Sequence, residues 1–200
     1  MADIIYSYGG KPYLNITNQC PCACVFCIRG QAEGLGSAAN LWHHADPSWE
    51  EIETALAAFD FSGAGEVVFC GYGEPFCALD HLRRAAVWLK EHFPALKLRV
   101  NTNGLGDLIY QRDTSKDLAG LVDTVSISLN APNAALYQQI CRCAYGEAAF
   151  GAMLLFARHC KEVYPNVIFS VVDVLSEETL SECRALASSM GIPLRVRRRA

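Results

Sequence analysis

Residues 13–27, with the sequence YLNITNQCPCACVFC, join a predicted strand at 13–17 to a loop that carries four cysteines. Three of these cysteines, Cys20, Cys24 and Cys27, have the spacing C-x3-C-x2-C, and Phe26 stands just before the last. Three thiolates on one short loop can bind three irons of a [4Fe-4S] cubane, which leaves the fourth iron without a protein ligand. The spacing therefore predicts an iron–sulfur cluster whose open iron can bind and reduce a substrate or cofactor.

A structural zinc site formed by the four cysteines of this loop is the alternative reading. The run C-x-C-x-C crowds a single tetrahedral ion, however, and no histidine stands close enough in the sequence to complete a common zinc pattern. We therefore expect the cluster, with Phe26 shielding it from solvent and Cys22 left as a spare thiol.

Segments with strand and helix patterns alternate outward from this loop along the chain. Short apolar runs alternate with runs that have helical spacing, and Ser48 is a candidate N-cap. Further strands are predicted at 66–70, 97–101, 124–129, 166–174 and 194–198, and helices at 48–61, 79–92, 115–120, 133–163 with a break near 145–146, and 177–190. Six βα units predict parallel strands with right-handed crossovers, in an α/β fold that forms a laterally open, partial (βα)6 TIM-like barrel.

The length of 200 residues suits one domain, so we expect a single domain over residues 1–200 with its cluster loop at 18–30. A content of 52% hydrophobic and 19% charged residues is typical of a well-packed α/β protein. No apolar run is long enough for a membrane span, and the net charge of −4 does not indicate a nucleic-acid-binding surface. The ten cysteines come without an export signal, so we expect reduced thiols in a cytoplasmic protein.

A second motif, Gly71-Tyr72-Gly73-Glu74-Pro75, follows the predicted strand at 66–70. Glycines allow a backbone to approach a ligand closely, and a carboxylate can accept a charge-assisted hydrogen bond from an ammonium group. A Gly-rich turn with a solvated glutamate is the alternative. Ligands gather where parallel strands end, so the position of the motif favours a binding role.

The loop C-x3-C-x-aromatic-C after a first strand resembles the signature of the radical S-adenosylmethionine (SAM) superfamily. The flanking residues 14–18 and 27–29 are similar to those of the TatD-associated radical SAM proteins. The resemblance implies that Cys20, Cys24 and Cys27 hold a [4Fe-4S] cluster and that SAM binds its open iron. It also implies reduction by flavodoxin or ferredoxin, cleavage of SAM to methionine and a 5′-deoxyadenosyl radical, and abstraction of hydrogen from a substrate that the sequence does not identify.

The resemblance also implies which residues contact SAM in the first half of the chain. In the superfamily, a Gly-Gly-Glu-Pro type motif holds the amino group of SAM. This implies the same role for Gly71, Tyr72, Gly73 and Glu74, with Tyr72 standing in place of the first of the two adjacent glycines.

Polar residues later in the chain complete the site that the resemblance implies. Ser126 and Ser128 alternate along the predicted strand at 124–129, so both project to one face, where they would contact the ribose or carboxylate of SAM. Asn103, which precedes Gly104, is either a SAM contact or a turn residue. Arg142 is either the partner of the SAM carboxylate or a surface arginine.

Two other functions stay open at this point. A glycyl-radical activase of the same superfamily would act on a protein partner, whereas a non-catalytic zinc or iron–sulfur module would carry out no reaction. Six cysteines lie outside the loop, among them Cys141 and Cys143. We expect most of these to be buried small side chains and not the ligands of a second cluster.

Overall fold

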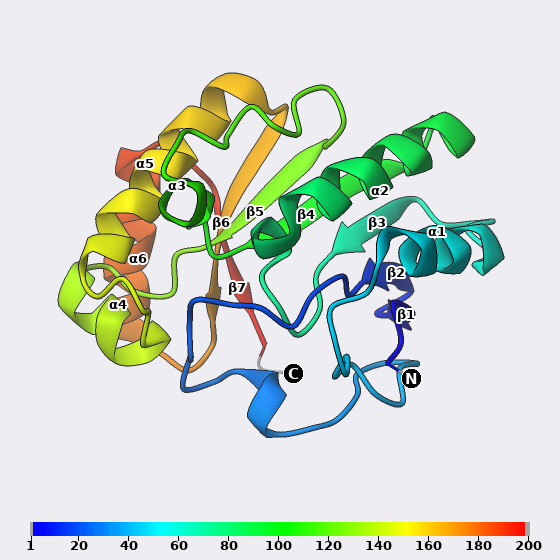
Figure 1. The fold of residues 1–200 in the computed structure, drawn as a ribbon. Coiled ribbons are helices and arrows are strands. Elements are labelled where there is room, and N and C mark those ends of the chain that lie inside the picture. Colours follow the sequence, from blue (N-terminus) through cyan, green and yellow to red (C-terminus); the bar gives the residue numbers. More distant parts are fainter. Residues whose placement is uncertain (1, 199–200) are drawn as a thin grey trace. The chain divides into compact units, whose positions relative to one another are not determined.

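The computed structural model describes residues 2–198, which fall into two compact units (Figure 1). The first unit comprises residues 2–20, 29–101 and 117–123, and the second comprises residues 21–28, 102–116 and 124–198. The chain therefore passes from one unit to the other within the predicted cluster loop, directly after Cys20. The expectation of one domain over residues 1–200 stays a prediction.

Four strands run through the described residues of the first unit. They are β1 (Ile5–Tyr8), β2 (Lys11–Leu14), β3 (Glu66–Phe69) and β4 (Lys97–Thr102), and the helices are η1 (Ile28–Gly30), α1 (Trp49–Ala58), η2 (Pro75–Ala78) and α2 (Leu79–His92). β2, β3 and β4 pair in parallel, with Leu14 opposite Phe69 and Phe69 opposite Val100. Val67, Val68 and Phe69 are fully buried, which confirms the prediction of a strand covered on both faces.

Strand β1 was not predicted from the sequence. It pairs antiparallel with β2 through a tight turn at Gly9 and Gly10, whose φ angles of 56° and 75° are left-handed. Two successive residues with positive φ match the twist of antiparallel strands, and glycine adopts this conformation without strain. The described residues therefore contain seven strands instead of the six predicted, and β2 begins and ends a few residues before the strand predicted at 13–17.

Asp123 fastens the end of α2 to β4 in the first unit. Its carboxylate accepts hydrogen bonds from Lys90 Nζ (2.9 Å), Lys97 Nζ (2.8 Å) and Leu98 N (3.0 Å). Burial alone would raise the pKa of Asp123, but these bonds outweigh burial and lower the pKa to about 2. The ionised carboxylate therefore stabilises the fold above the usual pKa of 3.8, and this contribution is lost as the pH falls from 3.8 to about 2.

We expect Asp123→Asn to lower the free energy of unfolding at neutral pH by about 1–2 kcal/mol, allowing for partial screening by water. The variant should also lose less stability than the unmodified protein as the pH falls from 3.8 to about 2. Urea unfolding at a series of pH values measures both effects. The control is Asp80→Asn, which removes an exposed carboxylate on α2. An equal loss of stability in the two variants at neutral pH would contradict the expectation.

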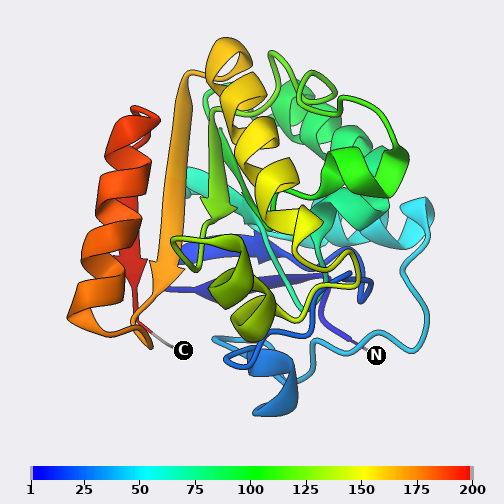
Figure 2. The same cartoon turned by 90° about the vertical axis from the view of Figure 1, so that its left-hand side faces the viewer.

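Three parallel strands and four α-helices make up the described residues of the second unit. In chain order they are α3 (Gly106–Tyr110), β5 (Thr124–Ser128), α4 (Ala134–Cys141), α5 (Ala148–Val163), β6 (Asn166–Val172), α6 (Glu177–Ser189) and β7 (Leu194–Arg197). β6 lies between β5 and β7, with Ser170 opposite both Ser128 and Arg195. Helix α5 contacts β5 and β6, and α6 runs along β7, which it contacts (Figure 2).

The helical region predicted at 133–163 consists of two helices, and the expected break near 145–146 is confirmed. Helix α4 ends at Cys141 because Arg142 adopts a left-handed conformation with a φ of 47°. Gly146, with a φ of 63°, lies in the turn before α5. This break places residues 142–147 outside the regular helices, where they can pack against another segment.

The helix predicted at 115–120 is wrong. Residues 115–121 form turns, and the helix in this part of the chain is α3. Asp113 Oδ1 accepts hydrogen bonds from Ser115 N (2.9 Å) and Ser115 Oγ (2.6 Å). Asp107 Oδ1 likewise accepts hydrogen bonds from Thr114 N (2.8 Å) and Thr114 Oγ1 (2.7 Å). These polar bonds fix the start of the segment, and Gly120, with a left-handed φ of 75°, ends it before a regular helix forms.

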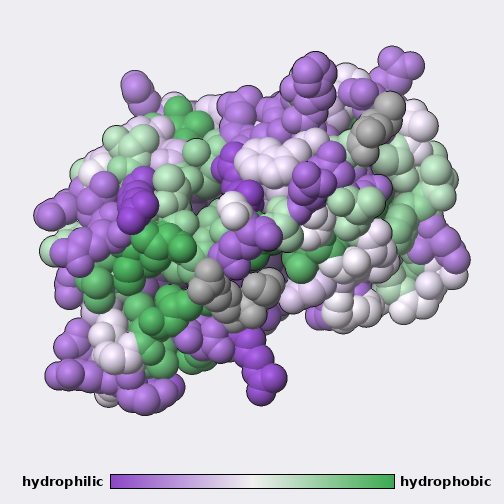
Figure 3. Space-filling view, turned by 90° about the horizontal axis from the view of Figure 1, so that it is seen from below, coloured by the Kyte–Doolittle hydropathy of each residue, from purple (hydrophilic) through white to green (hydrophobic). Residues whose placement is uncertain are grey.

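Exposed apolar side chains occur in several parts of the surface. The large ones include Val25, Trp42, Leu155 and Val196. On the face shown in Figure 3, apolar atoms lie in patches that purple hydrophilic side chains separate. Among the described residues, none of the helices combines the length and the apolar character needed to cross a lipid bilayer.

Candidate functional site

The cysteine loop of the second unit lies against the C-terminal end of α4. Ala23 N donates a hydrogen bond to Cys141 O (3.0 Å), and Val25 N donates one to Ile140 O (2.9 Å). The last carbonyls of a helix have no partner within the helix, so the loop satisfies α4 and α4 in turn fixes the loop. Of the three predicted ligands, Cys24 and Cys27 belong to this loop, and Cys20 is the last residue of the first unit before it.

The surroundings of Cys24 favour its ionised form. Hydrogen bonds from the thiols of Cys141 and Cys22 outweigh burial and lower the pKa of Cys24 to about 4. The hydrogen bond that Cys141 donates to Cys24, together with burial, raises the pKa of Cys141, so the Cys141 thiol keeps its proton. The thiolate is the form of cysteine that binds metal. Cys27 N donates to Cys24 O (3.0 Å) and closes the turn between these two predicted ligands, so the donor set of the loop fits iron.

Asn103 is in contact with the cysteine loop. Its Nδ2 lies 3.9 Å from Cys22 Sγ, and its Oδ1 accepts a hydrogen bond from Leu105 N (3.0 Å). Gly104 follows with a φ of 75°. Asn103 therefore holds the turn after β4, and its contact with SAM stays a prediction.

Asn130 is a candidate that the predicted site omitted. It is 5% exposed, and its Nδ2 donates to Cys141 Sγ (3.5 Å). Within the described part of the chain, its Oδ1 is buried and has no hydrogen-bond partner. Buried acceptors usually have a partner, so this oxygen is suited to a ligand that donates a hydrogen bond. The sequence held a signal for it, because Asn130 continues the alternation of Ser126 and Ser128.

The other predicted residues of the second unit differ in exposure. Ser126 is buried and Ser128 is half-buried on β5, whereas Arg142 is exposed directly after α4. The structure thus brings Asn103 and Asn130 into contact with cysteines at the loop and leaves the Arg142 side chain at the surface. The assignments of Ser126, Ser128 and Arg142 to SAM stay predictions.

The motif of residues 71–75 follows β3 in the first unit and packs against the segment that leads to Cys20. A Cβ atom on Gly71 would lie 2.1 Å from Asn15 Oδ1, and one on Gly73 would lie 2.2 Å from Thr17 O. Both distances exclude a side chain at these positions. The glycines therefore let the motif approach the 15–19 segment, and Glu74 N donates to Gln19 O (2.8 Å) directly beside Cys20.

Glu74 is buried, with 4% of its surface exposed, so the alternative of a solvated glutamate is wrong. Its Oε1 accepts a hydrogen bond from Phe76 N (3.1 Å) and caps η2. Burial raises the pKa of the Cys77 thiol to about 12, and the charges of Glu74, Cys20 and Asp46 add to this effect. The charges of Glu74 and Cys20 therefore both act on the Cys77 thiol.

Tyr72 stands where the superfamily pattern has a glycine, and the structure gives it a role within the protein. Its ring is buried, and its hydroxyl donates a hydrogen bond to Ala32 O. The ring also packs edge-on against Trp42, with 5.1 Å between ring centroids, and the Arg29 guanidinium lies 4.7 Å from the Trp42 centroid. Tyr72 therefore anchors the loop of residues 30–46 to the motif.

Asp46 is a further residue that the sequence did not single out. Its carboxylate accepts hydrogen bonds from Thr17 Oγ1 (2.8 Å), Asn18 N (2.8 Å) and Gln19 Nε2 (2.7 Å). Burial opposes ionisation, but these three bonds prevail and lower the pKa of Asp46. Asp46 therefore fixes the residues immediately before Cys20.

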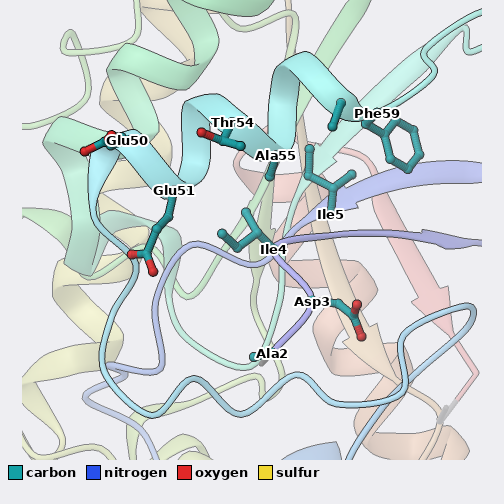
Figure 4. A pocket seen from close by; sticks show the side chains of 10 residues that line it. Ala2, Asp3, Ile4, Ile5, Glu50, Glu51, Thr54, Ala55 and Phe59 are labelled. Atoms are coloured by element: carbon teal, nitrogen blue, oxygen red, sulfur yellow. The ribbon is translucent and has the colours of Figure 1, made fainter.

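A groove of about 550 Å³ in the first unit lies between α1 and the N-terminal segment (Figure 4). Its lining includes Ile4, Ile5, Ala55 and Phe59, with Glu51 at one side. Glu51 already accepts a hydrogen bond from Ser48 N (2.7 Å) in the capping box of α1. None of the predicted site residues lines this groove, so we do not assign it to SAM.

Comparison with known proteins identifies a family and a fold. The family model described as "Radical SAM superfamily" matches residues 14–190. No curated protein matches the chain. The chain is similar to Streptococcus suis SuiB bound to the precursor peptide SuiA, with 20% identity, a TM-score of 0.68 and coverage of 92% of this chain and 38% of SuiB.

Two other solved structures have the same likeness. A radical SAM methyltransferase from Sphaerobacter thermophilus has 19% identity, a TM-score of 0.67 and coverage of 97% of this chain and 68% of its own. The structure of anSMEcpe with bound AdoMet has 14% identity, a TM-score of 0.64 and coverage of 94% of this chain and 50% of its own. The chain thus spans only part of the length of these proteins. At this identity the likeness shows the fold, and it confirms the predicted α/β class with a partial TIM-like barrel.

Proposed function

Because the chain belongs to the radical SAM superfamily, we propose that it is an enzyme that cleaves SAM reductively at a [4Fe-4S] cluster. The observation that carries the proposal is the bond from Glu74 N to Gln19 O (2.8 Å). It joins the motif expected to hold SAM to the residue that precedes the first expected cluster ligand. This bond supports the proposal, because it holds the backbone of Glu74 beside the residue before Cys20.

Cys20, Cys24 and Cys27 would hold the cluster. The ionised Cys24 and the half-buried Cys20 and Cys27 offer three sulfur ligands, and the α4 carbonyls keep the loop in place. When bound, the reduced cluster supplies the electron that splits SAM into methionine and a 5′-deoxyadenosyl radical, which abstracts a hydrogen atom from the substrate. Val25, which is exposed, and Phe26, which is half-buried, stand between Cys24 and Cys27 in the loop.

The residues of the two motifs orient SAM. The Glu74 carboxylate would accept hydrogen bonds from the ammonium group, and the close packing of Gly71 and Gly73 against residues 15–19 would hold the motif beside Cys20. In the second unit, Ser126, Ser128 and Asn103 are assigned to the ribose and carboxylate, as is the exposed Arg142. The buried Oδ1 of Asn130 adds an acceptor for a hydroxyl or amino group.

The finer assignments rest on the sequence. Residues 14–18 and 27–29 support membership of the TatD-associated radical SAM proteins. Radical SAM enzymes need a reductant, and we assign this role to flavodoxin or ferredoxin. We further assign the protein to the cytoplasm, where its ten cysteines would stay reduced.

Anaerobic reconstitution with iron and sulfide tests the proposal. We expect visible absorbance that bleaches with dithionite, and release of 5′-deoxyadenosine and methionine from SAM, measured by mass spectrometry. A colourless protein that binds zinc would contradict the proposal, as would a cluster that leaves SAM intact. Adding a cell extract separated into small molecules and macromolecules then distinguishes a small substrate from the protein partner of an activase, because the true substrate fraction accelerates SAM cleavage.

A further inference from the structure

Cys22 and Cys143 lie directly opposite each other in the second unit. They are partners in an isolated antiparallel bridge between the cysteine loop and the segment after α4. Beside them, Ala144 N donates a hydrogen bond to Pro21 O (2.8 Å), and on the other side Ala23 N donates one to Cys141 O (3.0 Å). The Cys22 and Cys143 side chains share a hydrogen bond, so the two sulfurs are neighbours.

The register of this bridge suits a disulfide. Cys143 N donates to Gln138 Oε1 (3.2 Å) and Cys143 O accepts from Gln138 Nε2 (3.1 Å), so Cys143 bonds to Gln138 and not to the Cys22 backbone. Residues in such a non-hydrogen-bonded pair have Cα atoms about 4.5 Å apart, within the span of about 4.4–6.8 Å that a disulfide bridges. The register of the two cysteines is thus one that a disulfide can span.

The two other cysteines near this bridge, Cys24 and Cys141, have different roles. Cys24 is an expected iron ligand, and Cys141 is 1% exposed and accepts a hydrogen bond from Asn130 Nδ2 (3.5 Å). Cys22 is half-buried, and Cys143 is its partner across the bridge. When the cluster is bound, Cys22 and Cys143 are thus the two thiols placed to react with each other.

We propose that Cys22 and Cys143 form a reversible disulfide that fastens the cluster loop to the segment after α4. The oxidant is a small-molecule disulfide such as oxidised glutathione. The thiolate of one cysteine attacks it and releases one glutathione thiolate, and the thiolate of the other then displaces the second. The two protein thiols are oxidised to one disulfide, and one glutathione disulfide is reduced to two glutathione thiols, so electrons and atoms balance.

The test uses the reconstituted protein, equilibrated without oxygen in buffers with increasing ratios of oxidised to reduced glutathione. After acid quenching, remaining thiols are alkylated and the protein is cut with trypsin. Cleavage after Arg142 and Arg158 isolates Cys143 on a peptide with no other cysteine, and separates it from Cys141. We expect this peptide to become linked to the peptide that ends at Arg29, with fragmentation placing the link at Cys22.

Matched variants decide the result. Cys22→Ser and Cys143→Ser should each abolish the linked peptide, whereas Cys183→Ser, which changes a buried cysteine of α6, should leave it unchanged. All three variants should keep their iron, and oxidation of the unmodified protein should raise its Tm but not that of Cys22→Ser. Full alkylation of Cys143 at every glutathione ratio would overturn the proposal, as would linkage of Cys143 to Cys20, Cys24 or Cys27. The linked peptide, the iron content and the Tm can all be measured without SAM cleavage.

Discussion

Cys24→Ala removes the bound iron, the visible absorbance and all SAM cleavage, whereas Cys22→Ala keeps all three close to their original levels. This result is expected because Cys24 is the predicted ligand with the lowered pKa, about 4, and a cubane held by two cysteines would leave two irons without protein ligands. Cys22 is not an expected ligand and lies opposite Cys143 across the antiparallel bridge. Iron analysis, absorbance spectra and 5′-deoxyadenosine release measure the three properties.

The comparison of the two variants separates ligation from structure. Both substitutions remove a thiol from the same loop, and neither removes a backbone bond to α4, so circular dichroism should show that both fold. An equal loss of iron in the two variants would show that the assigned ligand set is wrong. It would then favour a site that uses all four cysteines of the loop.

Glu74→Gln weakens SAM binding to the reconstituted protein by about 10–100-fold, the loss expected when a charge-assisted hydrogen bond to an ammonium becomes neutral. Glutamine retains an oxygen that can accept the bond from Phe76 N, so the cap of η2 survives. Equilibrium dialysis with labelled SAM measures the affinity. Glu50→Gln, which neutralises an exposed carboxylate in the first turn of α1, is the control and should bind SAM normally.

A third variant distinguishes charge from capping at Glu74. Glu74→Ala removes both the carboxylate and the cap, so it should also lose about 1 kcal/mol of stability, which Glu74→Gln should retain. SAM affinity that is unchanged in Glu74→Gln and lost in Glu74→Ala would show that the residue only shapes the loop. In that case the ammonium group must be held by another part of the site.

Features encoded by neighbouring residues were the predictable part of the fold. Ser48 caps α1 because its side chain accepts from Glu51 N (3.3 Å), and both residues stand within four positions. The apolar run of β3 and the break before α5 are equally local. The helix predicted at 115–120 failed for a local reason too, since Gly120 adopts a left-handed φ of 75° after only one turn.

The chemistry of the site was predictable only where a motif carried it. The three ligand cysteines and Glu74 were found by spacing and composition. Asp46 was not, because its importance arises from contacts with residues 17–19, nearly thirty positions away. The same holds for Cys141 at the end of α4 and for Cys143 just after it, which meet the cysteine loop only through tertiary packing.

The attachment of residues 21–28 to the last turn of α4 has a consequence for maturation. Zinc fingers are ordered by their metal, so ion uptake and chain collapse are one event. Here the main-chain bonds of Ala23 and Val25 to α4 use no metal-ligating atom, so part of the entropy of ordering the loop is lost when the polypeptide folds. An iron-delivery system would therefore meet a loop that is already folded. Apoprotein from which the iron and sulfide have been removed should keep its fold and accept both again.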